Sequence, residues 1–306
     1  MAVYSNGKAV HRADPEGASG DLKATEFVWR DPADIPRRPW LYGNHLIRKQ
    51  VSVTVAAGGV GKSTLTICDA LSMASGRQLL GDWTESGLKV WILNLEDTRD
   101  EMDRRIIATM QRYGIKPEDI EGRLYVDTGR ERGLITAFQS REGVQINEPE
   151  IDALAQEICD NHIDVLIVAP FVSSHQVSEN DNGAIDLVVK EFARLADRCN
   201  CGIELVHHTR KTNGDEATSE SGRGASALLA AARSGRVLNK MSDGMKAEAG
   251  VQDDPATYFS VTRDKANLAP AENGVWRRMA SVQLANGDSV AVVEAWERPD
   301  TFEGVT

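Results

Sequence analysis

The chain of 306 residues has few aromatic residues, few cysteines and no apolar run long enough to cross a membrane. Aromatic residues make up 6% of the sequence against 41% for all hydrophobic residues, so we expect a core of mainly aliphatic side chains. The four cysteines form no CxxC pair, which disfavours a metal site and favours reduced thiols. Residues 1–17 lack the apolar segment of a signal peptide, and we therefore expect a cytoplasmic protein.

The chain also lacks an excess of positive charge. It has 35 Lys and Arg against 46 Asp and Glu, which gives a net charge of −11 and a pI near 5.1. This balance argues against nucleic-acid binding through bulk charge. Any contact with nucleic acid is therefore expected to be local.

Apolar runs and helical patterns alternate along the chain from residue 51 to about residue 240. Runs such as VSVTVAA and DVLIVAP are typical of buried strands, and the amphipathic helices between them include one ending at Gly76 and one at Gly114. This βαβ repetition predicts an α/β fold with a mostly parallel twisted sheet and helices on both faces.

The length fits one large α/β domain or two small ones, and the pattern divides it into three parts. Residues 1–30 are polar and are predicted to form a mostly disordered tail. Residues 31–250 are predicted to form the core. Residues 251–306 read as strand pairs that complete the same domain, and the Asn-Gly at 286–287 marks a C-terminal β-hairpin.

A glycine-rich segment, AGGVGKST, joins the strand VSVTVA to a helix. Backbone N–H groups of such a turn bind phosphate oxygens, while the lysine reaches the β- and γ-phosphates and the serine hydroxyl ligates Mg²⁺. The first position of the usual pattern is Ala56 instead of glycine, but the later glycines still allow close approach. The sequence therefore predicts a site for ATP and Mg²⁺, with Ser63 as the metal ligand. Its members are Ala57, Gly58, Gly59, Val60, Gly61, Lys62, Ser63 and Thr64.

Five segments occur in a characteristic order: AGGVGKST, LNLEDTRDEMDRR, VLIVAPFVSSH, ELVHHTRK and RGASALLAAARS. Together they resemble the RepA-like branch of the RecA/DnaB ATPases, hexameric replicative helicases with plasmid, phage and mobile-element relatives. The resemblance covers residues 27–270. It implies a RecA-like P-loop core, a homo-oligomer that is expected to be a hexamer, and action on single-stranded DNA.

The resemblance assigns roles to two strand ends. Glu96 in LNLED matches the carboxylate that orients the attacking water, although the segment could instead be only a strand end followed by a helix cap formed by Asp97. A polar sensor of the γ-phosphate is expected at the end of ELVHH. Alternation along that strand favours His208 as the sensor and leaves His207 packed in the sheet.

Ring ATPases complete each site with a cation from the neighbouring subunit. The resemblance indicates Arg263 and Lys265, which are two residues apart and would lie on one face of a strand, with Arg233 as a second candidate. Each could instead be an ordinary surface cation. The segment after ELVHH carries Arg210 and Lys211, which the resemblance places on single-stranded DNA, the alternative being a solvent loop.

The strand VLIVAP ends in Ala169, where the family normally has an aspartate that accepts hydrogen bonds from Mg²⁺-bound water and from Ser63. Asp164 lies five residues earlier, near the opposite end of the strand, and cannot replace it. The sequence therefore predicts that ATP binds while hydrolysis is impaired.

These inferences make the chain an ATP-binding ring ATPase and a replicative DNA helicase by type, with no membrane partner. A nucleotide-gated DNA-binding or recruitment module without translocation is the alternative. A small-molecule kinase is a weaker one, because we find no arginine cluster typical of a kinase lid.

Overall fold

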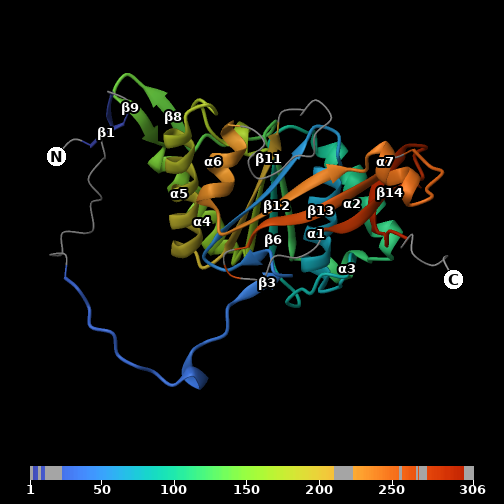
Figure 1. The fold of residues 1–306 in the computed structure, drawn as a ribbon, viewed down its shortest axis with the longest axis horizontal. Helices are drawn as coiled ribbons and strands as arrows, with labels where there is room; N and C mark the ends of the chain where they lie inside the picture. The colour runs from blue at the N-terminus through green and yellow to red at the C-terminus, as the bar shows by residue number, and fades with distance from the viewer. Residues whose placement is uncertain are drawn as a thin grey trace.

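In the part of the chain that the structure describes, nine strands form one central sheet of this computed structural model (Figure 1). The described residues are 3–5, 8–10, 23–209, 223–254, 257–266, 268 and 274–299, with the backbone alone at 3–5, 8–10, 209, 223–225 and 264–266. In spatial order the strands are β15 (Ser289–Ala295), β14 (Val275–Gln283), β13 (Tyr258–Ala266), β12 (Ser234–Lys240), β5 (Val51–Ala57), β11 (Gly202–Thr209), β10 (Val165–Ala169), β6 (Val90–Asn94) and β7 (Leu124–Thr128). The strands from β12 to β7 are parallel, whereas β13, β14 and β15 are antiparallel. The predicted α/β fold with a mostly parallel sheet is confirmed.

Helices cover both faces of the sheet (Figure 1). One face carries α4 (Glu148–Asn161), α5 (Asn182–Arg198) and α6 (Arg223–Ala231), and the other carries α1 (Lys62–Ser75), α2 (Arg99–Tyr113) and the short α3 (Pro117–Ile120). The chain also contains α7 (Asp243–Glu248) and the 3-10 turns η1 (Pro32–Asp34) and η2 (Phe171–Ser174). The predicted ends of α1 and α2 are confirmed, because Gly76 and Gly114 follow them in the left-handed conformation.

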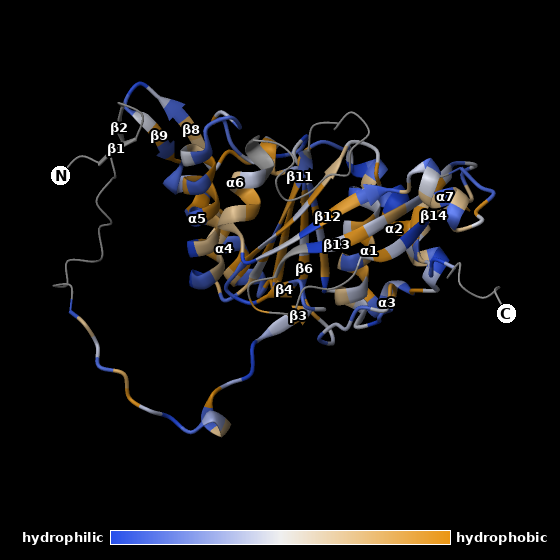
Figure 2. Ribbon diagram, in the orientation of Figure 1, coloured by the Kyte–Doolittle hydropathy of each residue, from blue (hydrophilic) through white to orange (hydrophobic). Residues whose placement is uncertain are grey.

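The strand β5 shows why the core forms on both faces. Its three valines pack with α5 and α6, and the hydropathy of the buried strands is high along most of their length (Figure 2). The alternate residues Ser52 and Thr54 are also fully buried, but they face the α1 side and are hydrogen-bonded there. A strand buried on both faces is typical of the centre of a parallel sheet.

Several strands escape sequence analysis. β12 lies in the run SGRVLNK next to β5, and three two-stranded pairs lie outside the main sheet. The pairs are β1 (Val3–Ser5) with β2 (Lys8–Val10), β3 (Trp40–Tyr42) with β4 (Leu46–Ile47), and β8 (Ala137–Ser140) with β9 (Gly143–Ile146). β1 and β2 fall within the region predicted as a disordered tail. The hydroxyl of the buried Tyr42 donates to Asp69 of α1 at 2.9 Å, which anchors the start of the folded core.

The C-terminal strands extend the same sheet, and β14 and β15 form the expected hairpin with Gly287 at φ +94°. The hairpin is fastened to α2. Arg104 donates to Asp288 at 2.8 Å, the Tyr113 hydroxyl donates to the carbonyl of Val293 at 2.7 Å, and Arg112 is paired with Glu294. These contacts bring a late segment of the chain over the first half of the core.

Candidate nucleotide site

The segment between β5 and α1 has the geometry of a phosphate-binding loop. Gly59 has φ +73° and Gly61 has φ +118°, conformations that favour glycine. A Cβ atom on Gly61 would also lie 3.3 Å from Met279 and from Phe259. Gly61 precedes α1 without capping it through a side chain, so the first N–H groups of α1 are available to an anion.

Lys62 is buried at the start of α1. Its Nζ donates to the carbonyls of Ala56 and Ala57 at 2.9 and 3.1 Å. Burial lowers the pKa of Lys62 to about 8, and the nearby Glu96 carboxylate opposes this shift. A phosphate would restore the charge balance around the ammonium group, which suits the role predicted for this lysine.

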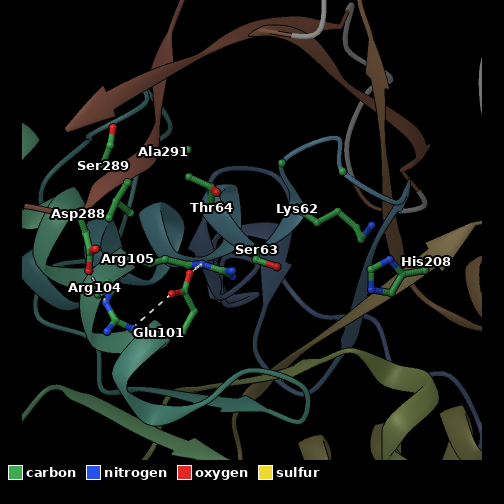
Figure 3. Close-up of a pocket in the computed structure, with 13 residues that line it drawn as sticks. Lys62, Ser63, Thr64, Glu101, Arg104, Arg105, His208, Asp288, Ser289 and Ala291 are labelled. Atoms are coloured by element: carbon green, nitrogen blue, oxygen red, sulfur yellow. Dashed lines mark hydrogen bonds and ion pairs between the residues drawn. The ribbon is translucent and has the colours of Figure 1, made fainter. Parts of the chain in front are cut away.

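A cleft of about 570 Å³ opens beside the loop (Figure 3). Lys62, Ser63 and His208 line it together with residues of α2 and of the β14–β15 hairpin. Among the described residues, no group of three or more His, Cys, Asp or Glu side chains is arranged to hold a metal ion. A Mg²⁺ ion would therefore be held by the Ser63 hydroxyl and by the phosphates it accompanies, which fits a metal that enters with the nucleotide.

Glu96 lies in a turn that Asn94 organises at the end of β6. The Asn94 side-chain oxygen accepts from the backbone N–H groups of Glu96 and Asp97 at 2.9 and 2.8 Å. The Glu96 carboxylate is more than half exposed and lies 3.7 Å from the His208 imidazole. Asp97 does not cap α2, because Thr98 does so by accepting from the backbone N–H of Glu101. Asp97 instead accepts from Arg105 at 2.9 Å.

The two histidines at the end of β11 face opposite ways, as alternation predicts. His208 lines the cleft with 41% of its side chain exposed, whereas His207 is buried against Phe171. Burial and the Lys62 charge lower the pKa of His208, while Glu96 raises it. The geometry therefore puts one polar residue between the phosphate loop and Glu96, where a sensor of the γ-phosphate is expected.

The far wall of the cleft comes from α2 and the hairpin, and sequence analysis did not find it. Glu101 accepts from Arg105 at 2.8 Å and lies 3.7 Å from Arg104, which in turn donates to Asp288 (Figure 3). Both arginines line the cleft within reach of an anionic ligand. The only local signal is the cluster of charges in TRDEMDRR, and Asp288 is 184 residues away from Arg104.

Lys240, the last residue of β12, is a second cation that sequence analysis missed. A Cβ atom on Gly59 would lie 4.0 Å from its Nζ. The ammonium group therefore lies beside the phosphate loop and adds positive charge there.

Ala169 ends β10 beside β6, where it pairs with Asn94 and its carbonyl accepts from the N–H of Leu95 at 2.7 Å. Asp164 lies at the other end of the strand and accepts from Arg48 at 2.5 Å and from the backbone N–H of Lys89 at 2.9 Å. Asp164 therefore stabilises the opposite edge of the sheet and cannot serve the cleft.

The candidate trans-acting cations need correction. Arg263 and Lys265 do not share one face, because a bulge in β13 pairs Arg263 with Arg236 and Lys265 with Gly235. Arg263 also has a use within its own subunit: its side chain is only 12% exposed and lies 3.5 Å from Asp82. The premise that it has none is wrong. The candidate DNA ligands at 210 and 211 lie outside the described residues.

Arg233 precedes β12, is exposed, and donates its backbone N–H to Val51 at the start of β5. Lys265 pairs beside it at the same edge. Since β5 spans seven residues, or roughly 20 Å, this edge is remote from the phosphate loop of the same subunit. Neither residue serves its own cleft.

A family model described as an AAA domain matches residues 18–214, which is more than half of the chain. The chain belongs to this AAA domain family. Its cleft is thus that of a P-loop ATPase, and proteins with this domain typically bind ATP with Mg²⁺. In the described residues, no helix is both long and apolar enough to span a membrane.

Two solved structures have a similar fold. The ATPase domain of a helicase matches with a TM-score of 0.54 and 10% identity over 76% of this chain and 82% of that chain. The RadB recombinase matches with a TM-score of 0.49 and 13% identity over 82% of this chain and 92% of that chain. At these identities the first match supports a RecA-like fold and nothing more. No curated protein matches the sequence.

Proposed function

We propose that this AAA-domain protein is a ring-forming ATPase of the replicative helicase type that acts on single-stranded DNA. The cleft carries the proposal: it joins Lys62, the Ser63 hydroxyl and the free N–H groups of α1 on one side to Glu96 and His208 on the other. Such an arrangement suits a nucleoside triphosphate whose γ-phosphate lies between the loop and the carboxylate.

Each residue of the cleft has a defined task in this proposal. Lys62 neutralises the β- and γ-phosphates, and Ser63 holds the Mg²⁺ ion, which bridges phosphate oxygens and offsets their charge. Glu96 orients the attacking water. His208, within 3.7 Å of Glu96, senses whether the γ-phosphate is present.

Assembly into a ring is the second part of the proposal. Arg233 and Lys265 lie at the edge of the sheet remote from their own phosphate loop. A cation at this edge is of use to phosphoryl transfer only in a neighbouring subunit, and this argument supports a homo-oligomer, expected to be a hexamer. Arg263 is not a candidate in this scheme because Asp82 holds it.

Ala169 favours a second candidate function, a nucleotide-gated DNA-binding or recruitment module. Without a carboxylate at this position, no side chain of β10 orients the metal-bound water or accepts from Ser63. Binding of ATP depends on other groups and should persist. A protein that binds ATP and turns it over slowly can assemble and recruit partners without translocating.

The deciding experiment measures ATP turnover with and without single-stranded DNA, for the unaltered chain and for Ala169→Asp. DNA-stimulated turnover in either form supports the helicase, and Ala169→Asp should raise turnover by roughly tenfold while ATP affinity stays within a few-fold. Adding Glu96→Gln to this variant should cancel the gain. Assembly on ATP without turnover in either form would support the recruitment module instead.

A further inference from the structure

The segment that precedes the core exposes large apolar side chains. Residues 23–39 are exposed throughout, and Phe27, Val28 and Trp29 are 84%, 80% and 71% exposed. The segment leaves the core as an extended arm, and apolar stretches are visible along it (Figure 2). Consecutive apolar side chains of this size on an extended segment favour a partner surface that removes them from water.

A pocket of about 250 Å³ lies under α4 at the β7 edge of the sheet. Its apolar lining consists of Trp91, Leu93, Leu134 and Leu154. The pocket shares no lining residue with the nucleotide cleft. It therefore has room for one large side chain without disturbing the phosphate site.

The polar groups of this pocket are almost all acceptors. The Thr128 hydroxyl is fully buried and has no hydrogen-bond partner among the described residues. Four carboxylates surround the opening against one guanidinium, that of Arg132, which lies 3.5 Å from Glu150. The other three carboxylates belong to Asp127, Glu131 and Glu157. The pocket therefore suits an aromatic group that donates a hydrogen bond and has a cation beside it.

Trp29 and Arg30 of the arm have this chemistry. The indole offers a large apolar surface and one N–H donor, and the guanidinium that follows it in sequence matches a rim of carboxylates. We propose that the Trp29 side chain of one subunit binds the α4 pocket of a second copy of this chain, with Arg30 against its carboxylate rim.

The arm is long enough for this contact. Ten residues separate Trp29 from Pro39, the last fully exposed residue before β3, and an extended chain of that length spans roughly 35 Å. The contact deepens the ring assembly of the proposed function and rests on it, but it is made without nucleotide. It would add to whatever contacts the subunits make around the ATP site.

The test is self-association of the full chain by sedimentation velocity, without nucleotide and over a range of concentrations. Trp29→Ala should weaken association by roughly thirtyfold, as loss of a buried aromatic anchor does. Ile35→Ala, which removes another exposed apolar side chain from the same arm, is the matched control and should have little effect. A second variant, Glu131→Arg with Glu157→Arg, should weaken association by reversing the charge of the rim.

A mixture of these two variants distinguishes docking between subunits from docking within one. Trp29→Ala retains an intact pocket and the rim variant retains an intact arm, so mixing them should restore a one-to-one complex that neither forms alone. Failure of the mixture to associate, or wild-type association by Trp29→Ala, would overturn the proposal.

Binding of a fluorescent ATP analogue by the same variants separates this inference from the proposed function. Unchanged nucleotide affinity also shows that the variants fold. Rings that form with ATP equally well in Trp29→Ala would refute the arm contact and leave the ring ATPase standing. A wild-type chain that stays monomeric with and without ATP would refute both the arm contact and the ring.

Discussion

Two buried histidines predict how the stability of the protein depends on pH. His175 and His207 are each about 5% exposed, and each has a buried ring nitrogen without a hydrogen-bond partner among the described residues. Burial lowers the pKa of both imidazoles to about 4, against about 6.5 in an unfolded chain. Both residues are therefore neutral in the folded protein near pH 7.

The sign follows from the number of protons bound. Below pH 6.5 the unfolded chain takes up protons at both positions while the folded protein does not, so stability falls with falling pH and levels off near pH 4. At pH 5 each histidine costs about 2 kcal/mol relative to pH 7.5, and the pair costs about 4 kcal/mol. A loss of this size is a large share of the total stability of an ordinary domain, about 5–15 kcal/mol.

Guanidinium denaturation at pH 7.5, 6 and 5 checks this expectation. His207→Phe keeps an aromatic ring beside Phe171 and should remove about 2 kcal/mol of the acid-induced loss, half of the total. His162→Asn is the control, because that exposed residue ends α4 in a left-handed conformation that asparagine also adopts. If His207→Phe loses as much stability between pH 7.5 and 5 as the wild type does, the argument from burial is wrong.

Three further changes test other parts of the molecule. Lys62→Ala should abolish ATP binding, since the phosphate charge loses its buried cation; titration with a fluorescent ATP analogue checks this, and unchanged affinity would contradict the phosphate-loop assignment. Arg236→Met should destabilise the fold by about 3–5 kcal/mol in chemical denaturation, because two buried carboxylates lose their guanidinium partner; a loss below about 1 kcal/mol would show that these carboxylates are not ionised. Replacing Arg210 and Lys211 by alanine should weaken single-stranded DNA binding for all sequences and lower its logarithmic salt slope by roughly 1.4, and an unchanged slope would move the DNA contact elsewhere.

The features that sequence analysis predicts well depend on short contiguous patterns. The phosphate loop needs only the order of strand, glycines and helix, and the structure places Gly59, Gly61 and Lys62 accordingly. The opposite orientations of His207 and His208 follow from alternation along one regular strand.

Features that depend on irregularity or on distant partners could not be predicted. A single bulge in β13 separates Arg263 from Lys265, and no local pattern marks the residue that causes it. The strand β12 was missed because a buried Ser234 and a buried Arg236 interrupt its apolar run. Both are satisfied only in the folded protein, where Ser234 bonds to His45 and Arg236 donates to Asp69 at 2.5 Å.

That buried group of charges links the elements on which the nucleotide site is built. Arg236 of β12 donates to Thr54 of β5, the strand that leads into the phosphate loop, and to Asp69 of α1. Thr54 also donates to Glu204 of β11, the strand that ends in His208, and Glu204 lies 2.9 Å from His45. Because breaking such a group leaves an unpaired charge in the core, it resists relative movement of these elements.

The rigid base explains why Ala169 should affect turnover and not the architecture of the site. The Glu96 turn is held by the Asn94 side chain, and the N–H of Leu95 donates to the carbonyl of residue 169, which alanine and aspartate supply equally. Neither contact needs a carboxylate at position 169. The missing group therefore acts on the position of the metal beside Ser63, and on nothing that holds Glu96 in place. For this reason the two proposed functions share one binding site and differ only in how often the bound ATP is hydrolysed.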